Sequence, residues 1–399
     1  MTDRFRGRED VVSCGTPPPP ATVSARAVLG ESGLDTRSEL PSTIRMTEPA
    51  IDDCAPTPPG LDLDRLAGHL AAHRPDLIDG PLHAELIAGG RSNLTYLLSA
   101  GEREIVLRRP PLGHVLATAH DMAREFRVIS ALAPTEVPVP TALLLCTDPE
   151  VIGAPFYLMA RVDGTVFRSR AQTDPLPDGQ RRELAMAMMD TLAALHTVDP
   201  ATVGLADFGR PQGFLARQVR RWSGQLDGSR SRPLPGIHEL RDRLANTAPE
   251  GSGTGRIVHG DYRLDNLLAT VDPVAVRAVL DWEMATLGDP LADLGLLLTY
   301  WDAMGGDAVP SNPVADGLGP RAGFPAGAEL IERYASRSGI DVGPLDWHVA
   351  LGCFKLAVIC EGIYYRHRQG QTLGEGFDQI GEMVAPLVAY GLTAVSRRS

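Results

Sequence analysis

Three oxygen-bearing side chains in the second half of the chain form a set that phosphoryl transfer could use. Asp261 lies five residues before Asn266, and Asp281 ends an apolar, strand-like run that begins at Val276. Transfer from ATP needs one carboxylate beside the acceptor hydroxyl, and hard oxygen ligands such as an amide oxygen and a second carboxylate for Mg²⁺. Asp261 is therefore the candidate acceptor of the hydroxyl proton, and Asn266 and Asp281 are the candidate metal ligands.

Each of these residues also has an ordinary structural explanation. Asp261 alone is well explained as the cap of a helix beginning near Leu264, and Asn is common in turns such as the one at Asn266. A buried strand seldom ends in an unpaired carboxylate, however, and a metal would partner Asp281. The combination of all three favours the functional interpretation. If the strand continues past Asp281, Glu283 lies on the same side.

The stretch around these residues resembles a known superfamily. The loop 259–266 reads H-G-D-x-x-x-x-N, and 281–283 reads D-W-E, which is similar to the small-molecule branch of the protein-kinase-like superfamily. This branch includes the aminoglycoside phosphotransferase and choline kinase-like families. The segment 354–372 narrows the resemblance to the kinase-like domain of acyl-CoA dehydrogenase family members ten and eleven.

The resemblance implies an enzyme that transfers the γ-phosphate of ATP, with Mg²⁺, to a hydroxyl of a small molecule. The implied acceptors are an aminosugar antibiotic, an amino alcohol or a hydroxyacyl-CoA. It also implies that His259 supports the loop and that Arg263 offsets phosphate charge during catalysis, although a solvated Arg263 is an equal alternative. Asp289 and Asp293 are expected to brace the loop. Peptide phosphorylation is not expected, because Gly260 replaces the Arg of protein kinases.

The elements that must position these residues follow from the hydrophobic pattern. Short apolar runs separated by Gly-containing turns predict three strands near 85–88, 94–99 and 104–108. Helical periodicity follows at 119–132, then two strands at 142–146 and 156–160. The remainder is mostly helical. With the resemblance, this order predicts an α+β, protein-kinase-like fold of two lobes: a small antiparallel β-sheet N-lobe with one helix (61–160), and a larger, mostly helical C-lobe (161–399). A disordered extension is expected at 1–60.

The N-lobe contains the candidate nucleotide-binding residues. Gly90, Ser92 and Asn93 lie in a Gly-rich turn whose backbone N–H groups are suited to covering phosphates, although most such turns merely join a hairpin. Strand alternation puts Val106 and Arg108 on one face, so that Val106 contacts adenine and Arg108 reaches the phosphates. The resemblance places the adenine-binding hinge after the fifth strand, which implies backbone contacts near Met159 and Arg161.

Arg108 stands where the family usually has a lysine. Arg is a planar, permanently charged fork, whereas Lys is a compact point charge. Glu125 on the following helix is the expected partner of Arg108; the alternative is a weak surface pair with Arg124 or Arg127. The missing lysine is the one feature that favours a second hypothesis, a catalytically weak nucleotide-binding pseudokinase acting through a partner. The sole lysine, Lys355, is expected with Arg366 on a helix lining the acceptor side.

Composition narrows the classes of partner. The net charge of −12 argues against nucleic-acid binding and reflects solubility or attraction of a cationic acceptor. Five cysteines without zinc spacing favour a reducing, cytoplasmic location. No uninterrupted apolar run reaches the roughly 20 residues of a membrane-spanning helix, so no membrane partner is expected. The pattern leaves the oligomeric state open. Met46 lies within the expected extension and is an alternative start, which an intact-mass measurement would test.

Overall fold

The computed structural model describes residues 58–87, 93–112, 121–229, 231–251, 255–310, 317–371 and 377–397. Residues 56–399 form one compact unit. Gly90, Ser92, Met46 and nearly all of the expected N-terminal extension lie outside the described residues. The last residues of that extension belong to the fold, because the Tyr96 hydroxyl donates a hydrogen bond to the Pro59 carbonyl oxygen at 2.6 Å.

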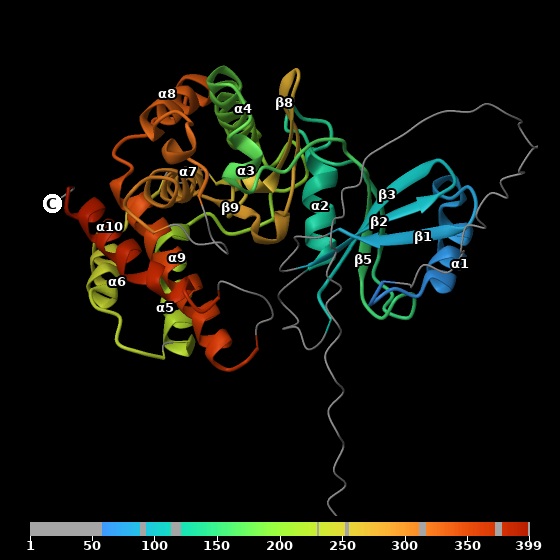
Figure 1. The fold of residues 1–399 in the computed structure, drawn as a ribbon, viewed down its shortest axis with the longest axis horizontal. Helices are drawn as coiled ribbons and strands as arrows, with labels where there is room; N and C mark the ends of the chain where they lie inside the picture. Colours follow the sequence, from blue (N-terminus) through green and yellow to red (C-terminus); the bar gives the residue numbers. More distant parts are fainter. Residues whose placement is uncertain are drawn as a thin grey trace, which may run out of the picture. The chain divides into compact units, whose positions relative to one another are not determined.

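A five-stranded antiparallel sheet forms the N-terminal part of this unit (Figure 1). Its spatial order is β1-β2-β3-β5-β4, so that the fifth strand along the chain lies between the third and the fourth. The predicted α+β arrangement is confirmed, although the first strand begins three residues before its predicted start. The strands are β1 (Leu82–Leu86), β2 (Leu94–Ala100), β3 (Arg103–Arg109), β4 (Ala142–Cys146) and β5 (Phe156–Ala160).

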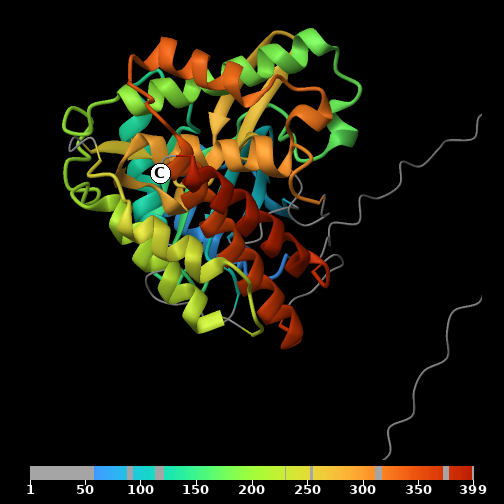
Figure 2. The same ribbon diagram turned by 90° about the vertical axis from the view of Figure 1, so that its left-hand side faces the viewer.

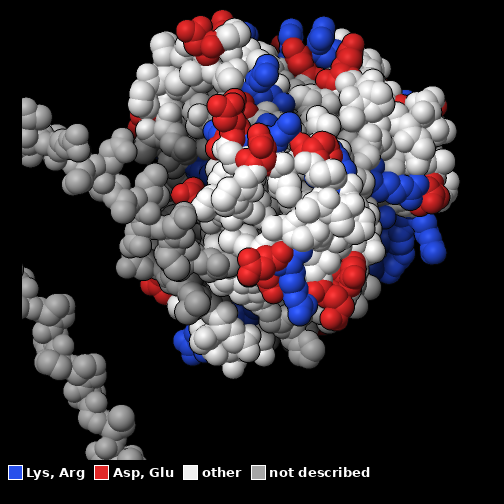
Figure 3. All heavy atoms as spheres, turned by 90° about the vertical axis from the view of Figure 1, so that its right-hand side faces the viewer, with Lys and Arg blue, Asp and Glu red and all other residues white. Residues whose placement is uncertain are grey.

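Two helices pack on this sheet, and the alternation of β3 explains why. Ile105 and Leu107 join the apolar cluster of α1 (Leu63–His73). Val106 joins the cluster that contains the buried side chains of α2 (Met122–Leu132). Both helices start at an Asp whose side chain accepts a backbone N–H of the first turn, as N-caps do. On the outer side of this part, acidic and basic side chains are interspersed (Figure 3).

The rest of the unit is mostly helical, with two small two-stranded sheets that flank the catalytic loop. In Figures 1 and 2, α9 runs through the middle of this part, and it packs against α5, α7 and α10. The helices are α3 (Arg170–Thr173), α4 (Asp178–Thr197), α5 (Phe214–Ser229), α6 (Ile237–Asn246), α7 (Pro290–Leu298), α8 (Gly327–Ser338), α9 (Asp346–Arg368) and α10 (Val384–Ser396). One small sheet pairs β6 (Arg256–Val258) with β9 (Thr286–Gly288), which lie far apart along the chain, and the other is the hairpin of β7 (Leu267–Val271) and β8 (Val274–Val279).

Helix α9 is apolar on nearly every side. In the described part of the chain it is the one helix long and apolar enough to cross a bilayer, with a mean hydropathy of 1.3 over its most apolar window. That window is 78% buried inside the fold, as expected for a central helix surrounded by others. Lys355 and Glu361 interrupt it, and both are buried.

One apolar cluster joins the two parts of the fold. It contains Val106 and Ile129 from the sheet and α2, and also Leu192 of α4 and Val279 of β8. A backbone hydrogen bond from the Val279 N–H to the Pro138 carbonyl oxygen, at 2.8 Å, links the parts as well. The groups at the junction are therefore held by a common core.

Candidate active site

A carboxylate of α7 anchors the loop that contains Asp261. The carboxylate of Asp293 accepts the backbone N–H groups of His259 at 2.6 Å and Gly260 at 2.8 Å, and His196 Nε2 lies 3.3 Å away. Burial alone would raise the pKa of Asp293, but the hydrogen bond and charge of His196 and the loop groups hold it below its usual value. Asp293 therefore stays ionised and fixes the loop, as the sequence predicted.

His259 and Gly260 set the path of the loop. His259 Nε2 lies 2.8 Å from the Leu280 carbonyl oxygen, to which it must donate, and Nδ1 accepts the Asp261 N–H at 3.2 Å. The predicted supporting role of His259 fits these bonds. Gly260 has a φ of 85°, and a Cβ there would lie 2.8 Å from atoms of Met284. Only glycine fits this turn without displacing the backbone.

Two side chains hold Asp261 in place by hydrogen bonds. Asn266 Nδ2 donates to the Asp261 backbone oxygen at 2.8 Å and to Oδ2 at 3.2 Å, and the Tyr300 hydroxyl donates to Oδ1 at 3.3 Å. The alternative of a helix cap at Asp261 does not apply, because the 3₁₀ turn at Leu264–Asn266 begins after Arg263. Asp261 thus has a fixed orientation suited to a proton acceptor.

The backbones at Asn266 and Asp281 lie close together because β7 and β8 are paired. The Leu280 N–H donates to the Asn266 carbonyl oxygen at 2.8 Å, which places Asp281 one residue from that bond. Asp281 has a φ of 64°, the one positive φ among described residues other than glycine. Such backbone strain is concentrated at functional sites. Strand β8 ends at Val279, so the condition under which Glu283 would share a side with Asp281 is not met, and Glu283 lies in a 3₁₀ turn.

The oxygen atoms of Asn266 and Asp281 suit a divalent cation that binds together with a nucleotide. The amide oxygen of Asn266 and the carboxylate of Asp281 are hard ligands, and protein sites commonly hold Mg²⁺ through one or two carboxylates plus substrate phosphates. Among the described residues, no group of three or more His, Cys, Asp or Glu side chains could hold a metal by itself. The assignment of Asn266 and Asp281 as ligands therefore depends on the phosphates and stays a prediction.

Arg108 forms the predicted pair with Glu125. Its Nε lies 2.9 Å from Glu125 Oε2, and its Nη2 pairs with Asp281. Glu125 is 1% exposed and also accepts the Tyr157 hydroxyl at 3.1 Å. Burial raises the pKa of Glu125, while Arg108 opposes that rise. Burial likewise opposes the charge of Arg108, but Glu125, Tyr157 and Asp281 outweigh it and raise its pKa.

The surface alternative for Glu125 is wrong, because both neighbouring arginines have other partners. Arg124 donates to the carbonyl oxygens of Phe208 and Ala285, and Arg127 pairs with Asp207. The two guanidinium groups are therefore unavailable for Glu125.

Asn93 links the carboxylates of Glu125 and Glu283. It is 2% exposed, and its Nδ2 donates to Glu125 Oε1 at 3.0 Å and to Glu283 Oε2 at 3.2 Å. Among the described residues its buried Oδ1 has no hydrogen-bond partner. This unmet acceptor is compatible with the predicted role of Asn93 in nucleotide binding.

The predicted adenine-contacting residues lie on paired strands. Val106 of β3 is opposite Met159 of β5, and they are 7% and 8% exposed. Arg161 follows β5 and pairs through its side chain with Glu104 and, at 3.3 Å, with Asp163. Its side chain is thus engaged at the surface, which agrees with a role limited to its backbone. Adenine contact by these residues stays a prediction.

Arg263 is neither solvated nor alone. Its guanidinium pairs with Asp265 and lies 4.5 Å from the centre of the Tyr300 ring. Burial opposes its charge, but Tyr300 and the acidic neighbours raise its pKa. Because Tyr300 also donates to Asp261, Arg263 supports the predicted proton acceptor through this ring. Its predicted contact with phosphate stays a prediction.

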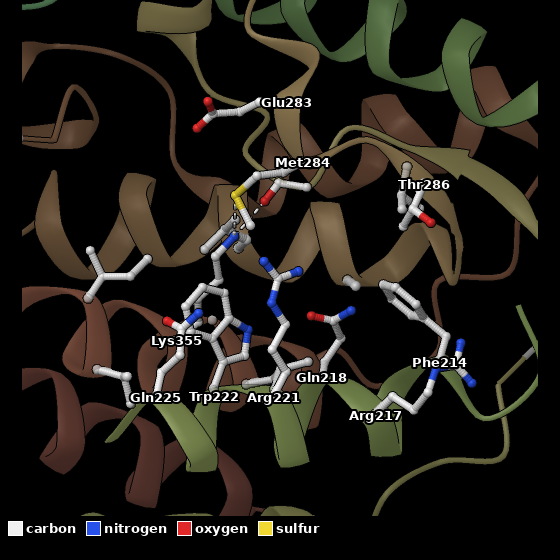
Figure 4. Close-up of a pocket in the computed structure, with 18 of the residues that line it drawn as sticks. Phe214, Arg217, Gln218, Arg221, Trp222, Gln225, Glu283, Met284, Thr286 and Lys355 are labelled. Carbon is white, nitrogen blue, oxygen red and sulfur yellow. Dashed lines mark hydrogen bonds between the residues drawn. The ribbon is translucent and has the colours of Figure 1, made fainter. Parts of the chain in front are cut away.

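A cavity of about 940 Å³ begins at Gly260 and extends between α5, α9 and the segment 283–286 (Figure 4). Its lining is strongly cationic. Six basic residues border it: Arg124, Arg210, Arg217, Arg221, Lys355 and Arg366. Three acidic residues do so as well: Asp121, Glu283 and Asp293.

Sequence reasoning placed Lys355 and Arg366 on this side but missed the rest. The available signal was weak: Arg217 and Arg221 recur at helical spacing on α5, which a solvated helix face explains equally well.

Fold and site together define a kinase-like phosphotransferase. The chain belongs to the phosphotransferase enzyme family, whose model matches residues 83–330. A protein from Ralstonia eutropha JMP134, solved as a candidate aminoglycoside phosphotransferase, is similar at 32% identity and a TM-score of 0.72, over 84% of this chain and 98% of that one. An aminoglycoside phosphotransferase in complex with GDP and kanamycin shares the fold at 15% identity, with a TM-score of 0.54, over 84% of this chain and 99% of that one.

Curated relatives point in the same direction as the predicted narrower resemblance. Acyl-CoA dehydrogenase family member 11 of Gallus gallus is 36% identical over 328 residues, covering 80% of this chain and 41% of the relative. Family member 10 of Mus musculus is 35% identical over 327 residues, covering 80% of this chain and 29% of the relative. The chain thus spans about two fifths or less of these relatives.

Proposed function

We propose that this protein transfers the γ-phosphate of Mg²⁺·ATP to a hydroxyl of a small anionic molecule, with a hydroxyacyl-CoA as the leading acceptor. The observation that carries the proposal is the packing of the catalytic loop, in which Asn266 donates to Asp261 and bonds through its backbone to the residue before Asp281. Gly260 of the same loop lines a cationic cavity. Bound Mg²⁺·ATP supplies the phosphoryl group and the charge that offsets its transfer. The protein supplies position and electrostatics.

Asp261 would orient the acceptor hydroxyl and take its proton at a carboxylate oxygen. Because phosphoryl transfer passes through a loose transition state, correct placement counts at least as much as basicity. Tyr300 and Asn266 provide that placement by fixing the two carboxylate oxygens. Asn266 would use its free amide oxygen toward the metal, since its Nδ2 is committed to Asp261.

The charge of the cavity favours one acceptor class among those implied by the family. An aminosugar or an amino alcohol is a cation, and six basic residues would repel it. A hydroxyacyl-CoA carries phosphates, which arginines bind well. The names of the curated relatives include acyl-CoA, which supports the same choice. The overall charge of −12 does not describe this cavity.

The test is transfer of label from γ-labelled ATP to a panel of acceptors. The panel contains hydroxyacyl-CoAs of several chain lengths, the matching free hydroxy acids, amino alcohols and aminoglycosides. We expect Mg²⁺-dependent labelling of a hydroxyacyl-CoA and none of the cationic compounds. Labelling of an aminoglycoside or an amino alcohol alone would overturn the acceptor assignment and leave the phosphotransferase intact.

One observation favours the pseudokinase alternative. Arg108 pairs with Asp281 as well as with Glu125, so the predicted metal ligand already has a cationic partner. The enzyme hypothesis requires that Asp281 release Arg108 and bind Mg²⁺ when ATP binds. Mg²⁺-dependent ATP binding without transfer to any acceptor of the panel would support the pseudokinase, and transfer would exclude it.

A further inference from the structure

Lys355 is the only lysine of the chain, and its charged end lies beside the catalytic loop. Its Nζ donates to the Gly260 carbonyl oxygen at 2.5 Å, and the sulfur of Met284 is 3.9 Å away. Both acceptors are neutral. Among the described residues no carboxylate forms an ion pair with Lys355, and an ammonium has three N–H donors. One donor is therefore available to a ligand in the cavity.

A second cation shares this end of the cavity. The ring centre of Trp222 lies 5.3 Å from Lys355 Nζ and 5.5 Å from Arg221 Cζ. Figure 4 shows Arg221 extending from α5 toward the same space that Lys355 reaches from α9. Burial lowers the pKa of Lys355, and Arg221 and Arg263 lower it further, while Asp261 of the loop and Asp293 of α7 oppose this. Lys355 is buried and Arg221 is exposed. Two cations at one end of a cavity repel each other, and an anion between them would relieve that repulsion.

We propose that Lys355 and Arg221 bind an anionic oxygen of the acceptor, from a carboxylate or a phosphate, and thereby place its hydroxyl at Asp261. The proposal rests on the proposed function in one respect, that this cavity holds the acceptor. Lys355 is a positioning residue in it, because its bond to Gly260 ties the bound anion to the residue that precedes Asp261. The competing explanation is that the ammonium only braces the loop.

The first test needs no turnover, because a sole lysine can be labelled selectively. The full-length protein is treated with pyridoxal 5′-phosphate and borohydride, or with pyridoxal, which lacks the phosphate, and the modified peptide is mapped. We expect Lys355 to react roughly 10-fold faster with the phosphate-bearing aldehyde, the scale of one charge-assisted hydrogen bond. Arg221→Gln should remove most of that preference. Equal rates for both aldehydes, or no reaction at Lys355, would overturn the proposal.

Protection distinguishes the two anion sources. Inorganic phosphate and malonate are added separately during labelling with pyridoxal 5′-phosphate. Protection by phosphate alone assigns a phosphate of the acceptor to this site, and protection by malonate alone assigns a carboxylate. Protection by neither contradicts an anion site.

The second test uses acceptor kinetics with Lys355→Met and Lys355→Arg. Loss of the charge should raise KM for the anionic acceptor roughly 10- to 100-fold and leave KM for ATP unchanged. Because a lowered pKa discharges Lys355 at a pH below its ordinary 10.5, kcat/KM should fall at alkaline pH, and Lys355→Arg should move that fall upward. A residue that only braces the loop would not change the pH profile.

The two tests separate this proposal from the proposed function. If the protein phosphorylates an anionic acceptor but Lys355 shows no preference for the anionic aldehyde, the Lys355 assignment fails and the function stands. If the preference exists but no acceptor is phosphorylated, the anion site stands and the function fails. Should Lys355→Met not fold, the labelling of the unmodified protein and the pH profile of Lys355→Arg still decide.

Discussion

The charged side chains on the two sides of the catalytic loop differ in whether they form ion pairs. On the predicted nucleotide side, Arg108 pairs with Glu125 and Asp281, and Asn93 satisfies the remaining oxygen of Glu125. On the cavity side, no ion pair involves any of the five basic residues of α5, α9 and the segment before α5, within the described part of the chain. These residues are Arg210, Arg217, Arg221, Lys355 and Arg366.

The difference separates the predicted nucleotide chemistry from the predicted choice of acceptor in physical terms. A buried charge without a partner is costly, so a fold retains one where a ligand supplies the partner. The paired groups of the nucleotide side can be rigid before anything binds. Lys355 is the buried one of these five basic residues and gains most when an anion enters; under the proposed function, that gain favours an anionic acceptor. Four variants test this contrast.

The largest effect is expected for Asp261→Ala, which removes the proposed proton acceptor. Turnover should fall roughly 10²- to 10⁴-fold, the scale for loss of a positioned general base. ATP affinity should change little, because the contacts of Asp261 are with the loop and Tyr300. Steady-state phosphate transfer and calorimetric ATP binding measure the two quantities. Asp207→Ala, an exposed aspartate paired with Arg127, is the matched control and should retain full activity. Unchanged turnover of Asp261→Ala would remove this residue from the mechanism.

Arg108→Met should cause the second largest effect, on stability as well as on ATP binding. It leaves Glu125 buried without its cation, which costs about 3–5 kcal/mol. Burial already raises the pKa of Glu125, so the folded variant takes up a proton as the pH falls and recovers part of the loss. The deficit should therefore be greatest at alkaline pH and shrink toward acidic pH.

Urea unfolding of Arg108→Met over a pH series measures this. The double variant Arg108→Met/Glu125→Leu is the control, because it removes the unpaired carboxylate and should regain most of the stability. A deficit that does not depend on pH would show that Glu125 is not its source.

The contacts within the catalytic loop could be expected from the sequence because they are local, while the catalytic and metal-binding roles stay predictions. Asp261 and Asn266 lie in one loop, and Asp281 follows the next strand but one, so short-range spacing contained the arrangement. The sheet was predictable for a similar reason, since β2 alternates between buried and half-buried residues, and β3 and β5 each contain a short run of buried apolar residues. The predicted start of β1 was too late, and the path of the chain after Asp281 was left open, because packing against distant segments decides where a strand starts and stops.

The cavity was beyond sequence reasoning because it depends on tertiary placement. Arg221 and Lys355 are far apart in the chain and come together only where α5 packs on α9. Taken alone, Arg221 is typical of a solvated helix face, and the net charge of −12 points toward a cationic ligand. Only the packing shows that the basic residues gather inside an acidic protein.

Asn93→Ala tests the link between the two sides. It removes the donor shared by Glu125 and Glu283, and hydrogen bonds to charged groups are worth about 1.5–3 kcal/mol. We therefore expect a smaller loss of unfolding free energy than for Arg108→Met, together with weaker ATP binding. Asn246→Ala, at the exposed end of α6, is the control and should change neither. Loss of acceptor binding alone would contradict the placement of Asn93 on the nucleotide side.

The smallest effect is expected at the outer edge of the cavity, for Arg366→Gln. Arg366 lines the cavity from the last turn of α9 but is exposed, so water screens its charge, and its contribution is about 0.2–1 kcal/mol. KM for an anionic acceptor should rise by a factor of roughly 2 to 5, and added salt should reduce the difference from the unmodified protein. Arg368→Gln removes the same charge two residues further along α9 without altering the cavity lining, and should have less effect. Equal effects of the two substitutions would mean that acceptor binding depends only on the total charge of this helix end, and not on whether the side chain lines the cavity. In that case, specific binding of an anion would be limited to Lys355 and Arg221.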